Sequence, residues 1–152
     1  MPSSRSASGR CSRLGVLCLA LAVALCGCGT KGRKTVHPVR GQVLLNGRPV
    51  PHATVTFHPV GSAAAELRPS GQTDEEGNFR LTSYAAGDGA PEGQYAVTVT
   101  WLRAFPVPGS PEGEQTATNV LPPHYASPAA SQLTANVSKG ANDLAPLQLY
   151  AR

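Results

Sequence analysis

The sequence predicts an all-β domain, and three observations carry that prediction. The 152 residues include 16 glycines and 14 prolines, whereas only 14% are charged, so residues that break helices recur every few positions. Apolar and polar residues alternate in several short stretches, which is the period of a half-buried strand. An Asn-Gly pair follows the first stretch, as expected for a β-hairpin. No helical periodicity extends beyond the N-terminal leader.

The first hairpin is expected to begin at residues 39–45. One face of this strand carries Val39, Gly41, Val43 and Leu45. Asn46-Gly47 comes next and suits the positive φ values at both central positions of a type I′ turn. Pro49 and Pro51 cannot donate to a ladder, which places the returning limb at an edge or in an extended connection.

Further strands follow from the same alternation. Residues 53–58 form the next one, whose inward side chains are Ala53, Val55 and Phe57. After a loop at 59–68 and an acidic turn at 74–78, the chain re-enters a sheet at 79–82. The clearest strand is 94–101, whose inner face carries Tyr95, Val97, Val99 and Trp101.

Two stretches near the C-terminus alternate again, at 133–137 and 147–149. Residues 104–118 contain three prolines, two glycines and two glutamates and are predicted to be an irregular loop, a kind of segment that often carries function. Residues 119–128 are predicted to be extended and broken by proline. About seven strands result, consistent with two sheets packed as a small sandwich.

Residues 1–27 have the features of a secretory leader. Arg5, Arg10 and Arg13 precede an apolar segment at 14–25, which is too short for a permanent membrane span. Removing these three arginines lowers the formal charge from +4 to +1 (4 − 3). A nearly neutral domain without a basic stripe is a poor polyanion binder, so no nucleic-acid partner is expected.

The end of this leader, Leu25-Cys26-Gly27-Cys28, resembles the bacterial lipobox, in which an aliphatic residue, a small residue and Gly or Ala precede a cysteine. The resemblance implies cleavage after Gly27 and a lipid on Cys28, which would hold the protein on a membrane. All four cysteines, Cys11, Cys18, Cys26 and Cys28, lie at or before this cut, so the exported domain would have no disulfide. The alternative is an ordinary signal peptide whose cysteines are small apolar residues.

Residues 28–35 are expected to form the lipidated N-terminus and a short polar tether. Lys31, Arg33 and Lys34 add a weak attraction to anionic lipid head groups. Gly29 follows Cys28 in place of the Asp that retains some lipoproteins in the inner membrane. This favours the outer membrane or the cell surface within the envelope.

Residues 36–152 resemble the carboxypeptidase regulatory-like domain, a transthyretin-like (prealbumin-like) Greek-key sandwich of seven strands found on short bacterial lipoproteins. The matching pieces are VRGQVLLNGRPVPHATVTFHP at 39–59, TDEEGNFRL at 73–81, EGQYAVTV at 92–99 and LPPHYASPAASQLTANVSKGAND at 121–143. The resemblance implies a non-catalytic accessory, adhesion or binding module, without peptidase activity.

The residues that could react or bind a metal do not stand in any recognised arrangement. The histidines do not stand at metal-ligand spacing and are interpreted as solvated loop residues: His37, His52, His58 and His124. Asp74, Glu76 and Asn78 alternate like the start of a calcium loop, but Phe79 and Ala85 occupy the places that need Gly and Glu. This stretch is therefore predicted to be an acidic turn, and no metal or cofactor is expected.

Three functions remain open at this point. The favoured one is a non-catalytic, membrane-anchored envelope lipoprotein that presents a structural or protein-interaction module. The alternative is a cell-surface glycan-binding module that uses Tyr84 and Tyr125, since Trp101 is in phase with the core face. The remote alternative is a small hydrolase, because hydroxyisourate hydrolases are transthyretin-like. Those enzymes end in Tyr-Arg-Gly-Ser, whereas this chain ends in Leu-Tyr-Ala-Arg, and no enzyme activity is expected.

Overall fold

The computed structural model describes residues 32–61, 67–110 and 114–151. The predicted leader, Cys28, the tether as far as residue 31 and part of the predicted loop at 59–68 lie outside the described residues. Lys34–Arg152 forms one compact unit. Within the described ranges, no helix has the length and apolar character needed to cross a bilayer.

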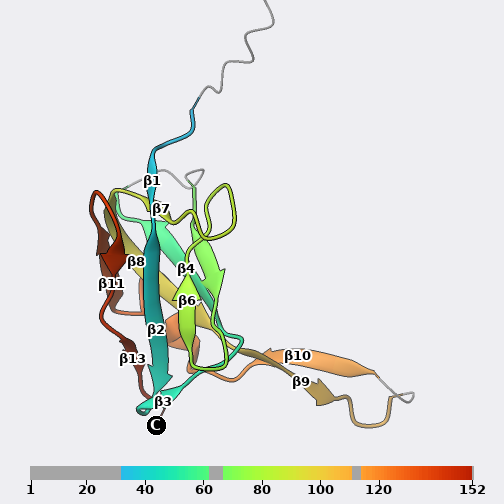
Figure 1. Ribbon diagram of the computed structural model, residues 1–152. Helices are drawn as coiled ribbons and strands as arrows, with labels where there is room; N and C mark the ends of the chain where they lie inside the picture. The colour runs from blue at the N-terminus through green and yellow to red at the C-terminus, as the bar shows by residue number, and fades with distance from the viewer. Residues whose placement is uncertain (1–31, 62–66, 111–113, 152) are drawn as a thin grey trace, which may run out of the picture. The chain divides into compact units, whose positions relative to one another are not determined.

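The described chain is built from short strands and one 3₁₀ turn (Figure 1). In chain order they are β1 (Val36–His37), β2 (Val39–Leu45), β3 (Arg48–Pro49), β4 (Thr54–Pro59), β5 (Ser70–Gln72), β6 (Asn78–Arg80), β7 (Ala90–Pro91), β8 (Gly93–Thr100), β9 (Leu102–Pro106), β10 (Gln115–Asn119), η2 (Pro123–Ala126), β11 (Leu133–Val137), β12 (Asn142–Asp143) and β13 (Leu147–Leu149).

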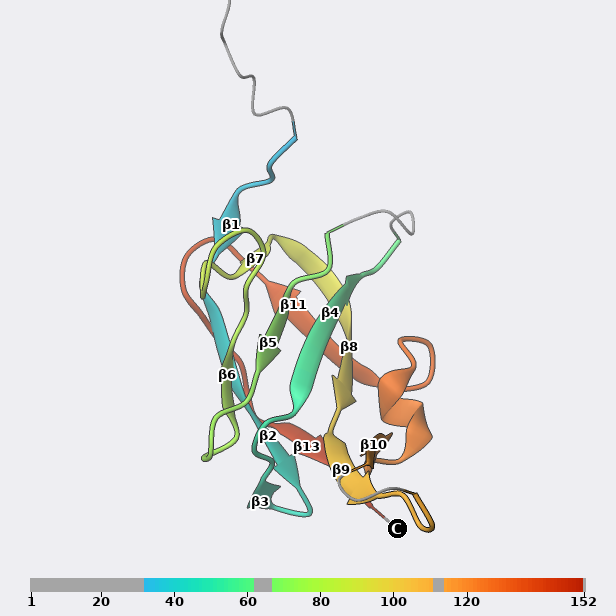
Figure 2. The same ribbon diagram turned by 90° about the vertical axis from the view of Figure 1, so that its right-hand side faces the viewer.

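Two sheets make up the body of the domain, which is an all-β sandwich, as predicted. One sheet has the order β11-β8-β4-β5 and is antiparallel throughout (Figure 2). The other is centred on β2, which pairs in parallel with β12 and β13 and antiparallel with β3 and β6. A separate short pair joins β1 to β7. The predicted count of seven strands and the Greek-key order stay predictions.

The core lies between these two sheets. Val55, Phe57, Val97 and Val99 are fully buried on one sheet, and Val43, Leu149 and the nearly buried Phe79 face them from the other. The rings of Phe57 and Phe79 meet edge to face with their centroids 6.5 Å apart. These are the alternate residues that the sequence placed inward.

The predicted type I′ hairpin is confirmed. Asn46 and Gly47 have φ values of 51° and 78°, and the flanking residues Leu45 and Arg48 are register partners. Thr73 secures the corner that follows: its hydroxyl donates to the carbonyl of Val50 (2.7 Å) and accepts from the N–H of Ala53 (2.8 Å). The buried polar group of Thr73 is therefore satisfied.

The prediction of an irregular loop at 104–118 is wrong. Residues 102–106 and 115–119 form a regular antiparallel hairpin, β9–β10, in which Leu102 lies opposite Asn119 and Pro106 opposite Gln115. Of the described residues that suggested a loop, Pro106 ends β9, and Pro108 and Gly109 lie beyond it, between the two strands. The extended stretch predicted at 119–128 is also partly wrong, because Pro123–Ala126 forms the 3₁₀ turn η2.

Candidate interaction surface

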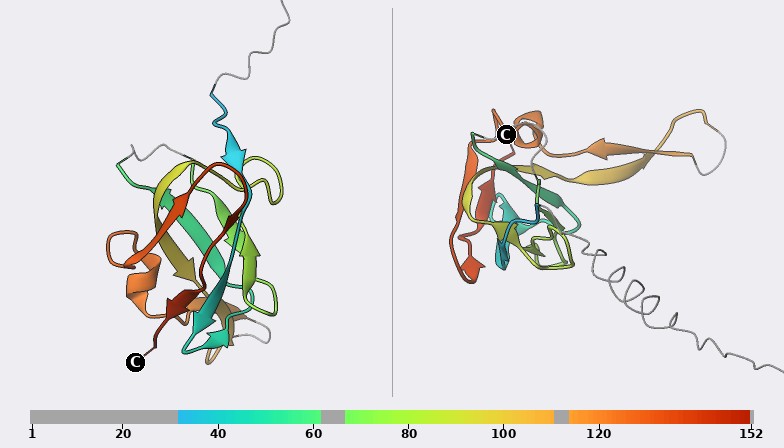
Figure 3. Two further views of the ribbon diagram at one scale, coloured as in Figure 1. Left: turned by 60° about the vertical axis from the view of Figure 1, so that its left-hand side comes forward. Right: turned by 90° about the horizontal axis from the view of Figure 1, so that it is seen from above.

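The β9–β10 hairpin, residues 102–119, projects away from the sandwich and is called the arm below. Figures 1 and 3 show it extending sideways from the end of the sandwich that carries β3, opposite the end with β1. Every residue of β9 is exposed, and so is every residue of β10 except the half-buried Asn119. The arm therefore contributes almost nothing to the core.

Two anchors hold the base of the arm. The side-chain oxygen of Asn119 accepts hydrogen bonds from the N–H groups of Trp101 (3.0 Å) and Leu121 (3.2 Å). The Trp101 ring is half-buried against the core, in line with the predicted inward position of this residue. The Arg103 guanidinium lies 5.5 Å from the centroid of the Trp101 ring. These contacts fix the direction in which the arm leaves the domain.

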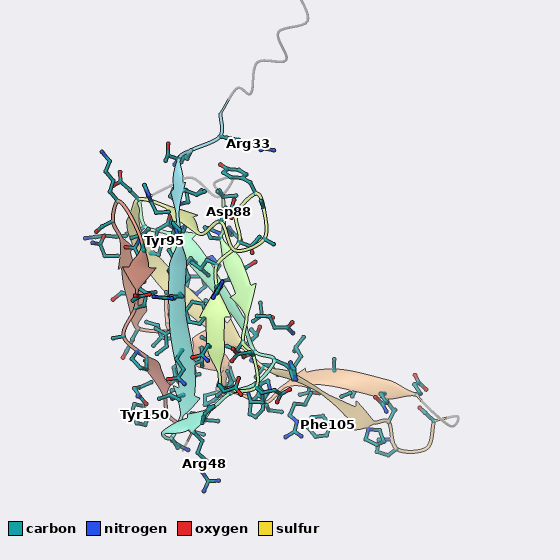
Figure 4. The ribbon with its side chains drawn as sticks, viewed as in Figure 1. Arg33, Arg48, Asp88, Tyr95, Phe105 and Tyr150 are labelled. Carbon is teal, nitrogen blue, oxygen red and sulfur yellow. The ribbon has the colours of Figure 1, made fainter. Side chains whose placement is uncertain are left out.

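The arm exposes large apolar side chains. The exposed fractions are 60% for Leu102, 44% for Phe105 and 37% for Val120 at its base. Figure 4 shows Phe105 on the arm, outside the body of the sandwich. Exposed apolar residues are common singly, but a two-stranded hairpin without a packed face is marginal by itself in water. Such a segment gains stability when another surface covers it.

A second feature is a groove of about 710 Å³, called the polar groove below, which is lined by β2, β6 and β12 and by Gln72 of β5. Its lining includes Gln42, Gln72, Asn78, Arg80 and the Arg40–Asp143 ion pair. The Arg40 guanidinium donates to both carboxylate oxygens of Asp143, through Nε and, at 2.9 Å, through Nη2. Arg40 and Arg80 are directly opposite on neighbouring strands.

The ion pair in this groove shifts the acid–base behaviour of both partners. The hydrogen bond from Arg40 holds the pKa of Asp143 below its usual range, and the same bond raises the pKa of Arg40. Asp143 thus compensates one of the two facing cations, while the described residues place no ion pair on Arg80. Asp74 also lines the groove, so the two carboxylates balance the two guanidinium groups, and Phe79, Leu144 and Pro146 add apolar surface beside these polar groups.

The two tyrosines proposed for glycan binding do not form a platform. Tyr125 is buried in η2, and its hydroxyl accepts a hydrogen bond from the Tyr150 N–H (2.9 Å), so the expectation that it is exposed is wrong. Tyr84 is 36% exposed, and its hydroxyl accepts from the Lys34 N–H (3.1 Å). The alternation of apolar and polar residues could not predict the burial of Tyr125, because this residue lies in a 3₁₀ turn and not in a strand.

The four histidines lie apart, and the expectation of solvated loop residues is wrong for two of them, because His37 lies in β1 and His58 in β4 and both are half-buried. Nδ1 of His37 accepts from the Gly140 N–H at 3.2 Å, and His52 contacts Glu75 at 2.9 Å. His58 lies 2.9 Å from the Thr98 hydroxyl, and burial, followed by the charge of Arg68, lowers its pKa. The ring of His124 is tilted by 45° against that of Tyr125, with the two centroids 4.0 Å apart. Within the described residues, no three His, Cys, Asp or Glu side chains gather in a metal-binding arrangement.

The acidic stretch at 74–78 forms a turn. One oxygen of the Asp74 carboxylate accepts hydrogen bonds from the N–H groups of Glu76 (3.1 Å) and Asn78 (2.7 Å). Gly77 completes the turn with a φ of 76°, close against the carbonyl of Val43. The Asp74 carboxylate is therefore used to hold the loop together, and the predicted acidic turn is confirmed.

No protein-family model and no curated protein sequence matches this chain. Several solved structures resemble it, including the following two. A 9R-lipoxygenase from Cyanothece PCC8801 matches 79% of this chain with a TM-score of 0.41 and 18% identity, and the match spans 17% of the lipoxygenase. A Pseudomonas aeruginosa protein provisionally described as carbohydrate binding also matches 79% of this chain, with a TM-score of 0.39 and 12% identity over 92% of its own length. At these identities and scores, neither likeness carries a function over to this chain.

Proposed function

We propose that this chain is a non-catalytic envelope lipoprotein, anchored by a lipid on Cys28, whose β-sandwich presents the arm as a protein-interaction surface. The observation that carries this proposal is the arm itself. Ordering two strands costs conformational entropy, which burial inside this domain does not repay because the strands are exposed. Pairing with another protein would offset that cost.

The arrangement of the domain supports this proposal. The chain enters the sandwich at β1, and the arm leaves from the opposite end (Figure 1). If a lipid holds the chain at Cys28, β1 lies near the anchor in sequence and the arm lies at the far end of the domain. A surface in that position is accessible to partners away from the membrane.

The anchor is tested by following Cys28→Ala in cell fractions. Wild type should partition with membranes and incorporate a fatty-acid analogue, because two or more acyl chains give stable anchoring. Cys28→Ala should lose both properties. The matched control is Cys26→Ala, which changes the neighbouring cysteine to another small residue and should keep both. An unlabelled wild type would contradict the lipid anchor.

The interaction surface is tested with a photo-crosslinking amino acid placed in living cells. At Phe105 on the arm it should give a discrete adduct with a protein. At Thr134, which is exposed on β11 of the sandwich, it should not. The absence of an adduct at Phe105, or equal adducts at both positions, would argue against the arm as the interaction surface.

The second candidate function is glycan binding, and the polar groove is the observation that favours it. Amide and guanidinium groups of Gln42, Gln72 and Arg80 offer the donors and acceptors that sugar hydroxyls and carboxylates need. A glycan array with the full chain should then show binding that Gln72→Ala and Arg80→Ala abolish. Tyr84→Ala, outside the groove, serves as the control. Retention of binding in the groove variants would exclude this surface.

A further inference from the structure

We propose that the partner of the arm is the arm of a second copy of this chain. The free edges of the two β10 strands would pair antiparallel about a twofold axis at Ala117, so that two hairpins form one four-stranded sheet. This inference rests on the proposed function of the arm, and it names the partner.

Hydrogen bonds at both ends of the arm establish which groups face outward. The N–H of Val107 donates to the carbonyl of Glu114 (3.2 Å), and that of Val120 donates to the carbonyl of Trp101 (3.0 Å). Because inward and outward groups alternate along an antiparallel strand, the backbone N–H and C=O groups of Gln115, Ala117 and Asn119 point away from β9.

The outer edge of β10 lacks the usual protection against strand pairing. Among the described strands, β10 pairs only with β9. Its five residues include no charge, no proline and no glycine, and charged side chains or proline are the common means of blocking an edge. The outer edge of β9, by contrast, is interrupted by Pro106, which has no N–H to donate. Only the β10 edge offers an unbroken row of donors and acceptors.

The sequence of β10 is nearly symmetric about its centre. It reads Gln115-Thr116-Ala117-Thr118-Asn119, with Thr on both sides of Ala117 and an amide side chain at each end. Antiparallel pairing about Ala117 would place Thr116 opposite the partner's Thr118 and Gln115 opposite the partner's Asn119. Thr–Thr pairs across strands are favourable, and small alanines at the axis let the two backbones approach.

The charges of the arm agree with the same arrangement. Within its described part, the charged residues are Arg103 and Glu114. Both belong to hydrogen-bonded pairs of the ladder, so both side chains lie on the same face. A twofold axis at Ala117 brings Arg103 of one copy to the same face as the partner's Glu114, with opposite charges across the new interface. The other face joins Ala104 and Ala117 from both copies.

The register is tested by introducing one additional cysteine into the full chain, expressed with its leader. Disulfide-linked dimers are then measured without reductant in the cell fraction that contains the protein. Ala117→Cys should form a disulfide-linked dimer, since residues opposite each other in a hydrogen-bonded pair have Cα atoms about 5.5 Å apart. Gln115→Cys lies on the same edge and face but meets its own copy four residues out of register, about 13 Å away along the strand. It should not link, and wild type sets the baseline.

A second pair of variants removes the dependence on thiol chemistry. Ala117→Lys places two like charges opposite each other at the axis and should abolish the dimer measured by light scattering. Gln115→Lys has the same charge and exposure and should leave most of the dimer intact. Circular dichroism checks that both variants remain folded.

Each outcome decides the proposal. A dimer that links at Ala117 and is lost in Ala117→Lys supports it. A monomeric wild type, equal linking at positions 115 and 117, or a disulfide to a different protein overturns it. The last result would leave the proposed function standing, because the arm would still bind a protein. Loss of membrane anchoring would not affect the readout, which is taken in either fraction.

Discussion

At the scale of single residues, close backbone contacts impose a glycine at position 89. Its φ is 99°, and a Cβ there would collide with the carbonyl of His37. Gly87, two residues earlier, has a φ of 70° and open space where a Cβ would stand. Both glycines therefore have a positive φ, but only at Gly89 would a Cβ collide with the neighbouring backbone.

Gly89→Ala and Gly87→Ala should separate these two effects. Gly87→Ala should cost about 1 kcal/mol of unfolding free energy, which is the left-handed penalty alone. Gly89→Ala should cost about 2 kcal/mol more, because β1 and its neighbours must shift to relieve the overlap. Urea unfolding of both variants measures the difference. Equal losses would mean that the contact with His37 yields without cost.

Asp88 organises the loop before β7 through its carboxylate. It accepts hydrogen bonds from the N–H groups of Ser83 (2.7 Å), Tyr84 (3.0 Å) and Ala85 (2.9 Å). Burial raises the pKa of this carboxyl group, but the hydrogen bonds outweigh burial and the pKa lies below its ordinary value.

The lowered pKa of Asp88 predicts a loss of stability in acid. The ionised carboxylate stabilises the folded state above the unfolded pKa of about 3.9, and this contribution disappears as the pH falls through the lower folded pKa. Asp88→Asn should therefore be less stable than wild type at neutral pH and should lose less stability on acidification. Thermal unfolding at several pH values between about 7 and 2 provides the measurement. An unchanged acid dependence would contradict this role.

At the scale of elements, the sequence predicted strands well where one face is buried. Val55 and Phe57 in β4 alternate with more exposed residues because the core dictates their pattern. Val97 and Val99 in β8 fill the same core, although Thr98 between them is also buried. The arm has no buried face, so no such pattern exists in β9 or β10. The sequence feature that favoured a strand here was the pair of β-branched residues Thr116 and Thr118, which are weak evidence for a strand by themselves.

An arm with no core contacts should be removable. Replacing residues 104–117 with Asn-Gly would close the hairpin directly between Arg103 and Thr118, a hydrogen-bonded pair suited to a type I′ turn. The unfolding free energy should change by less than about 1 kcal/mol, since the deleted strand residues 104–106 and 115–117 are exposed. A large destabilisation would show that the arm supports the sandwich.

At the scale of the whole molecule, pairings between distant segments complete both the fold and the groove. Leu147–Leu149 pairs in parallel with Val43–Leu45, and Arg40 reaches Asp143 across a sequence separation of 103 residues. Local alternation predicts that such strands exist but says nothing about which strands become neighbours. The polar groove could not be predicted for this reason, whereas the inward residues that fill the core could.

Two leucines differ in what they contribute to stability, because one lies inside the sandwich and the other on the arm. Leu149 is fully buried in β13, the C-terminal strand, whereas Leu102 is 60% exposed on β9. Leu149→Ala removes the same atoms as Leu102→Ala but leaves a cavity between the sheets. It should cost about 2–5 kcal/mol of unfolding free energy, against about 0.5 kcal/mol or less for Leu102→Ala. Urea unfolding of the two full-length variants tests this. Similar losses of stability in both variants would contradict the separation of the arm from the core.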